Sequence, residues 1–95
     1  MNIVYLNGEF LPKERAQISV EDRGFLLSDG IYEVTPAYRG EFFCLDQHLN
    51  RLRCGLNALR IEYDPEELIE VHQKLLDINN LTDSEVAIVY LQITR

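Results

Sequence analysis

Short apolar runs bounded by turn-forming residues stand near the start of the chain, a pattern typical of strands. Ile3 to Leu6 predicts a short strand, and Asn7-Gly8 supplies the two positive-φ residues that a two-residue hairpin turn requires. Glu9 to Leu11 then predicts the returning strand. The chain is therefore expected to begin with a β-hairpin.

A second hairpin is predicted where β-branched and aromatic residues alternate from Ile31 to Tyr38. Arg39-Gly40 is a turn signal, and Glu41 to Leu45 predicts the partner strand. Pro36 has no N–H to give to a strand ladder, so we expect this position at a sheet edge or a bulge.

The segment between the two hairpins has no clear period. Ala16 to Ser19 predicts another short strand. Glu21 to Gly30 mixes polar and apolar residues and contains the turn-forming residues Gly24 and Asp29-Gly30, so we expect an ordered loop there.

A helix is predicted in the middle of the chain, from about Gln47 to Arg60. Asp46 is its expected N-cap. Leucines at spacings of three and four would share one face of this helix: Leu49, Leu52, Leu56 and Leu59.

A second helix has a clear start signal, because Asp64 is followed by a proline and two glutamates, and proline is favoured at the first helical position. Asn79-Asn80 would end it. After it, Glu85 to Thr94 predicts a strand with apolar residues on both faces, as expected for a strand covered on both sides. The apolar stripe of the second helix would consist of Leu68, Val71, Leu75 and Ile78.

Together these elements predict an α+β fold, a small antiparallel sheet with two helices, and a single domain over residues 1–95. Because the last strand pattern is still running at Arg95, we expect a longer protein. A domain of this size buries only about 60 to 65% of its unfolded surface, so packing against another domain or subunit would stabilise it.

The net charge of −7 disfavours nucleic acid and anionic membranes as partners. No apolar run approaches the roughly 18 residues of a membrane span, and no signal peptide is recognisable. Cys44 and Cys54 form no Cys-x-x-Cys pair, so we expect two buried thiols, no metal site and a reduced, cytoplasmic setting.

Candidate chemistry lies on one predicted strand and one predicted helix. A strand has a side-chain period of two, so Tyr32 and Val34 point to one face and Glu33 to the other. His48 and Arg51 are three residues apart near the start of the first helix and can face the same neighbour. A guanidinium at this place is suited to a phosphate, although an arginine on a helix is more often a solvated surface residue.

The ordered series EDRGFLLSDGIYEV (residues 21–34), Arg39-Gly40 and HLNRL (residues 48–52) resembles the N-terminal domain of fold-type IV pyridoxal-phosphate-dependent aminotransferases. Within this family the chain is most similar to the D-amino acid (D-alanine) aminotransferases. The similarity extends more loosely from Asn7-Gly8 to the final Ile-Thr-Arg, and thus covers nearly the whole chain. The series of motifs is far more specific than any one of them.

The resemblance implies the cofactor pyridoxal 5'-phosphate and the transfer of an amino group from a D-amino acid to a 2-oxo acid. It assigns Arg51 to the cofactor phosphate, and Tyr32 and Val34 to the substrate pocket. Glu33 and His48 match motif positions and would support the site with hydrogen bonds that orient Tyr32 or Arg51. The family also implies a homodimer.

In the family, the catalytic lysine lies in a larger C-terminal domain that follows this one. We therefore assign no catalytic residue to this chain, whose only lysines are Lys13 and Lys74, and expect it to be inactive alone. Leu27-Ser28 and Thr35-Pro36-Ala37 depart from the family pattern, which leaves the substrate open. Alternatives are a branched-chain or amine transaminase, an aminodeoxychorismate lyase, which Tyr32-Glu33-Val34 disfavours, and a non-catalytic binding or dimerisation module.

Overall fold

Asn7 and Gly8 turn the chain between β1 (Ile3–Leu6) and β2 (Glu9–Pro12), in a computed structural model that describes residues 2–95. The two residues have φ angles of 50° and 90°, the left-handed values that the sequence predicts here. Leu6 pairs with Glu9 at the closed end, and the two strands form a sheet of their own. The first predicted hairpin is confirmed.

The second sheet has three antiparallel strands in the order β4-β3-β5, which are β3 (Gly30–Tyr38), β4 (Glu41–Phe42) and β5 (Ala87–Thr94). Strands β3 and β5 pair along their whole length, from Gly30 opposite Thr94 to Ala37 opposite Ala87. The predicted partner strand Glu41 to Leu45 is shorter than expected. Cys44 has a left-handed φ of 58°, which reverses the chain and starts a helix at Leu45.

Pro36 lies on the middle strand, beside the end of β4, and not on an outer edge of the sheet as expected. Its carbonyl accepts a hydrogen bond from the N–H of Phe43 at 2.9 Å, so both backbone groups of Pro36 face the side of β4. β4 pairs only with Ala37 and Tyr38. From Gly30 to Thr35 this edge of β3 has no strand partner among the described residues, so the missing N–H of Pro36 falls at the end of the β4 ladder.

Helix α2 (Leu45–Leu59) packs its leucine face against β3. Leu49, Leu52 and Leu56 are at most 2% exposed and form the centre of the core. Gly55 permits the close approach, because a Cβ at this position would lie 1.6 Å from the terminal methyl carbon of Ile31. The predicted N-cap is wrong: Cys44 is the N-cap, and Asp46 lies in the first turn, since the helix begins two residues earlier than expected.

Helix α3 (Leu68–Ile78) follows a 3-10 turn whose start is capped by the carboxylate of Asp64, as the Asp-Pro signal predicts. Asn79 ends α3, also as predicted, and it connects this helix to the first hairpin. Its amide side chain accepts a hydrogen bond from the N–H of Ile3 at 2.8 Å and donates one to the carbonyl of Ile3 at 3.0 Å. Asn79 thus fixes β1 beside the end of α3.

The segment between the hairpins differs from both predictions. Ala16 to Ser19 forms no strand, because the hydroxyl and the carbonyl of Ser19 accept hydrogen bonds from the N–H groups of Glu21 and Asp22 and bend the chain instead. The expected loop contains a short helix, α1 (Arg23–Leu27). The carboxylate of Asp22 caps it by accepting from the N–H of Gly24 at 2.8 Å.

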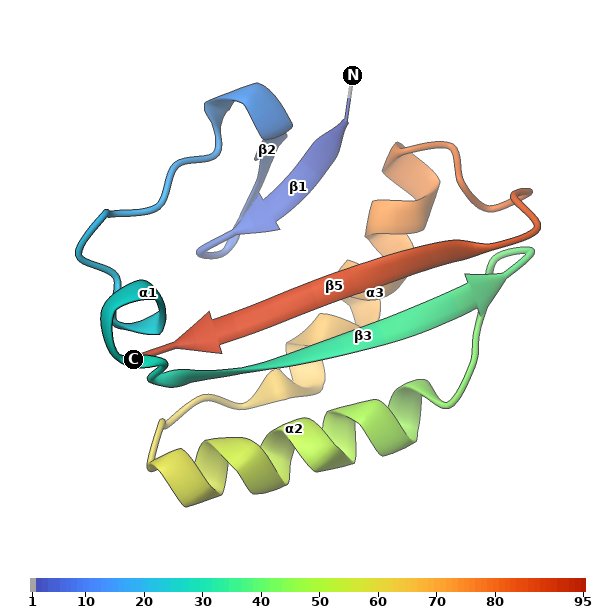
Figure 1. Ribbon diagram of the computed structural model, residues 1–95. Coiled ribbons are helices and arrows are strands. Elements are labelled where there is room, and N and C mark those ends of the chain that lie inside the picture. The colour runs from blue at the N-terminus through green and yellow to red at the C-terminus, as the bar shows by residue number, and fades with distance from the viewer. Residues whose placement is uncertain (1) are drawn as a thin grey trace.

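The longer helices lie on one face of the three-stranded sheet, and Figure 1 shows α2 beside β3 and α3 crossing behind β3 and β5. On that face Ala37, Thr35 and Val89 are buried. On the opposite face Ile88 and Tyr90 are 62% and 57% exposed, so the prediction that the last strand is covered on both sides is wrong for the described residues. We call this opposite side the open face. The α+β class with small antiparallel sheets is confirmed.

Within residues 2–95, no helix combines the length and the apolar character that crossing a bilayer would need. The thiols of Cys44 and Cys54 are free. Their expected burial is wrong, since Cys44 is half-buried and Cys54 exposed. Cys54 follows Arg53 on the side of α2 that faces away from the leucine core, which explains its exposure.

Candidate functional site

Glu33 lies at the centre of a polar cluster with His48 and Arg51. Strand β3 turns the Glu33 side chain inward, where it is 2% exposed, and α2 presents His48 and Arg51 from successive turns. The carboxylate accepts from Nδ1 of His48 at 2.6 Å and from Nε and Nη2 of Arg51 at 2.6 and 2.9 Å. The sequence predicts that these three residues support one site, and the structure brings them into direct contact.

The cluster is electrostatically matched. The hydrogen bond from Arg51 lowers the pKa of Glu33 below its usual value; His48 adds to this effect, and burial opposes it. The same contact raises the pKa of Arg51. The paired and charged forms are therefore favoured, and a buried carboxylate holds the guanidinium in a defined orientation.

The guanidinium of Arg51 has N–H groups that are available to bind an anion. Its hydrogen bonds within the described residues use two of the five N–H groups of the guanidinium and leave three. The side chain is 71% exposed although its partner is buried. One edge of the guanidinium thus faces the protein, and the other is accessible to a ligand from solvent.

Tyr32 and Val34 lie on the open face, as the strand period predicts. The ring of Tyr32 is stacked on that of Tyr90, with the centroids 5.9 Å apart and the planes at 23°. Gln92 is directly opposite Tyr32 in the sheet and accepts a hydrogen bond from the hydroxyl of Tyr90 at 2.5 Å. The place of Tyr90 and Gln92 beside Tyr32 could not be predicted from a local pattern, because it depends on a strand register that spans about sixty residues of sequence.

The polar cluster and the open face belong to opposite sides of β3. Both sides border the edge of β3 from Gly30 to Thr35, which has no strand partner among the described residues. After the contact with Glu33, the phenol of Tyr32 also contributes to the raised pKa of Arg51. A molecule at this edge could contact the guanidinium through one of its groups and the aromatic surface through another. The roles of these five residues toward a ligand stay predictions: Tyr32, Glu33, Val34, His48 and Arg51.

The two lysines lie outside the polar cluster. Lys13 is in a 3-10 turn after β2, and the ammonium of Lys74, on α3, lies 4.6 Å from the centre of the Phe10 ring. Neither residue contacts Glu33, His48 or Arg51 in the described structure.

Comparison with known protein families shows the family to which the chain belongs. The model for amino-transferase class IV matches residues 30–95, which include β3, α2, α3 and β5. The chain belongs to the class IV aminotransferases. The resemblance to fold-type IV aminotransferases is therefore confirmed, and the matched residues include Tyr32, Glu33 and the HLNRL motif.

Curated relatives of this class IV chain carry the name D-alanine aminotransferase. The protein of Staphylococcus aureus is 39% identical over 97 residues and that of Staphylococcus epidermidis 42% identical over the same length. Both alignments cover the whole chain but only 33% of the relative. The chain thus spans about a third of the length of the curated relatives it matches.

Solved structures of related folds agree with the architecture. The fold IV transaminase CpuTA1 of Curtobacterium pusillum has a TM-score of 0.80 at 23% identity, and the branched-chain aminotransferase of Thermoproteus uzoniensis has 0.77 at 24%. These two cover 92% and 96% of this chain and show the fold alone; each alignment spans 31% of the solved chain. The 4-amino-4-deoxychorismate lyase of Pseudomonas aeruginosa is 32% identical, with a TM-score of 0.66, over 84% of this chain and 28% of the lyase.

Proposed function

We propose that the full-length protein is a pyridoxal-phosphate-dependent aminotransferase that transfers an amino group from a D-amino acid to a 2-oxo acid. Family membership supports the aminotransferase class, and relatives named D-alanine aminotransferase support the D-amino acid. A homodimer in the cytoplasm is part of the same proposal. The observation that carries it is the guanidinium of Arg51, held by a buried carboxylate and open on its other side.

Arg51 fits a phosphate group. A phosphate accepts several hydrogen bonds at once, and Arg51 offers three N–H donors in a planar fork that Glu33 already orients. Glu33 offsets part of the positive charge, so Arg51 alone provides geometry more than net charge, and further donors would have to come from the rest of the protein. Arg51 would hold the phosphate of pyridoxal 5'-phosphate, with His48 and Glu33 keeping the guanidinium in place.

The cofactor, when bound, would supply the electron-withdrawing system that allows an amino group to pass between amino and oxo acids. The residues of this chain would bind and orient. Tyr32 and Val34 would line the substrate pocket, where the phenol can donate a hydrogen bond to a substrate carboxylate and the aromatic surface excludes water. The proton-transferring lysine would lie in the larger C-terminal domain.

A phosphate-binding test uses the full-length protein with Arg51→Ala and, as a matched control on the same helix, Arg53→Ala, which removes an exposed ion pair with Glu66. Loss of a charge-assisted hydrogen bond should weaken pyridoxal-phosphate binding about 10-fold or more in Arg51→Ala only. Absorbance titration with the cofactor measures the dissociation constant. An unchanged value in Arg51→Ala would refute the phosphate assignment.

One alternative reaction has a specific observation in its favour, the 32% identity to the aminodeoxychorismate lyase. Supplying the purified full-length protein with D-alanine and 2-oxoglutarate, or with aminodeoxychorismate alone, separates the two. Pyruvate formed from D-alanine supports the proposal. Pyruvate formed only from aminodeoxychorismate would assign the protein to the lyases, and activity with branched-chain L-amino acids alone would assign it to the branched-chain enzymes.

A further inference from the structure

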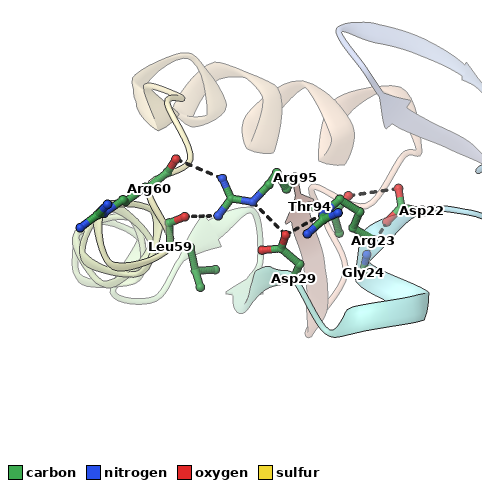
Figure 2. A network of polar contacts seen from close by, with 8 residues as sticks. All are labelled: Asp22, Arg23, Gly24, Asp29, Leu59, Arg60, Thr94 and Arg95. Atoms are coloured by element: carbon green, nitrogen blue, oxygen red, sulfur yellow. Dashed lines mark hydrogen bonds and ion pairs between the residues drawn. The ribbon is translucent and has the colours of Figure 1, made fainter.

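A second charged network lies where four segments of the chain meet: the start of α1, the start of β3, the end of β5 and the end of α2 (Figure 2). Oδ2 of Asp29 accepts hydrogen bonds from Nε of Arg23 at 2.9 Å and from Nε of Arg95 at 2.8 Å. The carbonyl of Asp29 also accepts from the N–H of Arg95 at 3.1 Å. Side chain and backbone of Asp29 thus hold Arg95, the residue that follows β5.

Arg95 reaches further, to the end of α2. Its Nη1 donates to the carbonyl of Arg60 at 3.3 Å, and its Nη2 donates to the carbonyl of Leu59. The last carbonyls of a helix have no partner within the helix and form the negative end of its dipole, which a guanidinium satisfies. Figure 2 shows this one side chain between the end of α2 and Asp29. Arg23, in contrast, contacts Asp29 but none of the α2 carbonyls.

The same junction is fixed on its other side by Thr94. The Thr94 hydroxyl donates to the carboxylate of Asp22 at 3.1 Å, and the other oxygen of that carboxylate caps α1. Gly30 shows how tightly the strands meet here, because a Cβ on Gly30 would lie 2.7 Å from the carbonyl oxygen of Ile93. The position of the β3 start is therefore set by contacts from β5, α1 and α2.

This junction lies at one end of both elements that carry the candidate site, before the start of β3 and at the end of α2. Asp29 comes directly before β3 and three residues before Tyr32. Leu59 follows Arg51 by eight residues on α2, about 12 Å along the helix at 1.5 Å per residue. Arg95 is the described side chain that contacts both the residue before β3 and the end of α2 through hydrogen bonds. A shift of α2 along β3 would separate Arg51 from Tyr32, and the guanidinium of Arg95 opposes such a shift.

We propose that Asp29 and Arg95 are positioning residues that set the spacing between Arg51 on α2 and Tyr32 on β3. The identity of the ligand rests on the proposed function. The effect of Asp29 and Arg95 on the relative position of α2 and β3 does not depend on it. Arg95 and Arg23 are 42% and 51% exposed, and ion pairs of this exposure contribute little to folding stability. The expected effect is therefore on geometry more than on folding.

Asp29→Asn and Arg95→Gln in the full-length protein should lower kcat/KM for D-alanine about 10-fold, chiefly through KM, because Tyr32 is displaced relative to the cofactor. Cofactor affinity should change less than twofold. Arg95→Lys should rescue part of the loss, since a lysine can pair with Asp29 but cannot serve two helix carbonyls at once. Arg23→Gln is the matched control: it removes a partner of Asp29 without touching α2 and should stay within about twofold.

Hydrogen exchange tests the coupling independently of activity. Asp29→Asn and Arg95→Gln should speed exchange of the amides of Ile31 and Glu33, which face β5, and of the last turn of α2, whereas Arg23→Gln should not. Altered exchange in a protein that does not transaminate D-alanine would refute the proposed function and keep the positioning role. Unchanged exchange, unchanged kcat/KM, or a kinetic loss that follows the melting temperature across the variants would overturn the positioning role.

Discussion

Glu33 is a buried carboxylate whose two oxygen atoms are both occupied, one by Arg51 alone and one shared between His48 and Arg51. A carboxylate in this situation is stabilised in its charged form, and removal of its charge leaves two donors without an ionic partner. Glu33 therefore links folding stability to the orientation of Arg51, the residue that we propose to bind the phosphate. It is the residue of the site whose protonation state matters most.

Glu33→Gln should destabilise the protein by about 1 to 3 kcal/mol at pH 7, because a charge-assisted pair becomes neutral. The lowered pKa of Glu33 sets the pH dependence: its contribution is complete above the ordinary value of 4.5 and is lost as the pH falls through the folded-state pKa. The stability difference between parent and variant should thus shrink below about pH 4.5. Urea unfolding at several pH values between 3 and 7 measures it.

Glu62→Gln, at an exposed position, is the control for the loss of a negative charge. A parent and a Glu33→Gln variant whose stabilities run parallel from pH 3 to pH 7 would contradict the role of Glu33 as a charged partner.

Single residues were predictable from the sequence where a local period applies. The strand period of two places Tyr32 and Glu33 on opposite faces, and the spacing of three places His48 and Arg51 together. That Glu33 contacts both helix residues follows only from the packing of α2 on β3. Asp29 with Arg95, which are 66 residues apart, could not be found by any local pattern.

Among the elements, α2 provides the core and also carries the candidate anion ligand. Leu52 has no measurable exposure and lies between Leu49 and Leu56 in the apolar cluster. Its neighbour Arg51 is on the solvent side of the same helix. A change in the packing of the leucine face would therefore also displace the guanidinium.

Leu52→Ala should lower the free energy of unfolding by about 2 to 5 kcal/mol, because it removes buried surface and leaves a cavity. Asn57→Ala, at an exposed position of the same helix, should change it by no more than about 0.5 kcal/mol. Chemical denaturation of the three proteins provides the comparison. Equal effects of the two substitutions would contradict the assignment of the leucine face to the core.

The elements that are predictable from the sequence are those with several repeats of a period or a strong terminal signal, such as the leucine repeat of α2 and the Asp-Pro start before α3. Those that it missed are short. Helix α1 has five residues and depends on the cap by Asp22, and β4 has two because Cys44 adopts a left-handed conformation. The conformation of a single residue produces no repeating pattern in the sequence, so these two elements could not be predicted from periodicity.

For the whole molecule, the open face of β3 and β5 is exposed in the described chain. Tyr32, Ile88 and Tyr90 are more than half exposed there. An apolar sheet face of this kind is suited to contact with a further part of the protein or with a ligand. This agrees with the prediction that a larger domain completes the enzyme, which stays a prediction.

The 95-residue chain alone, mixed with pyridoxal 5'-phosphate, D-alanine and 2-oxoglutarate, should form pyruvate no faster than the free cofactor does, because its two lysines lie outside the polar cluster. A coupled assay for pyruvate measures the rate, and circular dichroism establishes whether the chain is folded. Enzymatic turnover that disappears in Lys74→Ala or Lys13→Ala would contradict the assignment of the catalytic lysine to another domain.

Since β3 presents Glu33 on one side and Tyr32 on the other, inserting or deleting one residue between Asp29 and Tyr32 would exchange the two sides. The phenol would enter the leucine interior, and the carboxylate would face the solvent. The number of residues in this segment is therefore fixed by the strand period, whereas the side chains that the segment carries can vary more freely. Under the proposed function, substitutions at the even-numbered residues of the strand would alter the substrate pocket, whereas an insertion or deletion of one residue would disrupt the core and the polar cluster together.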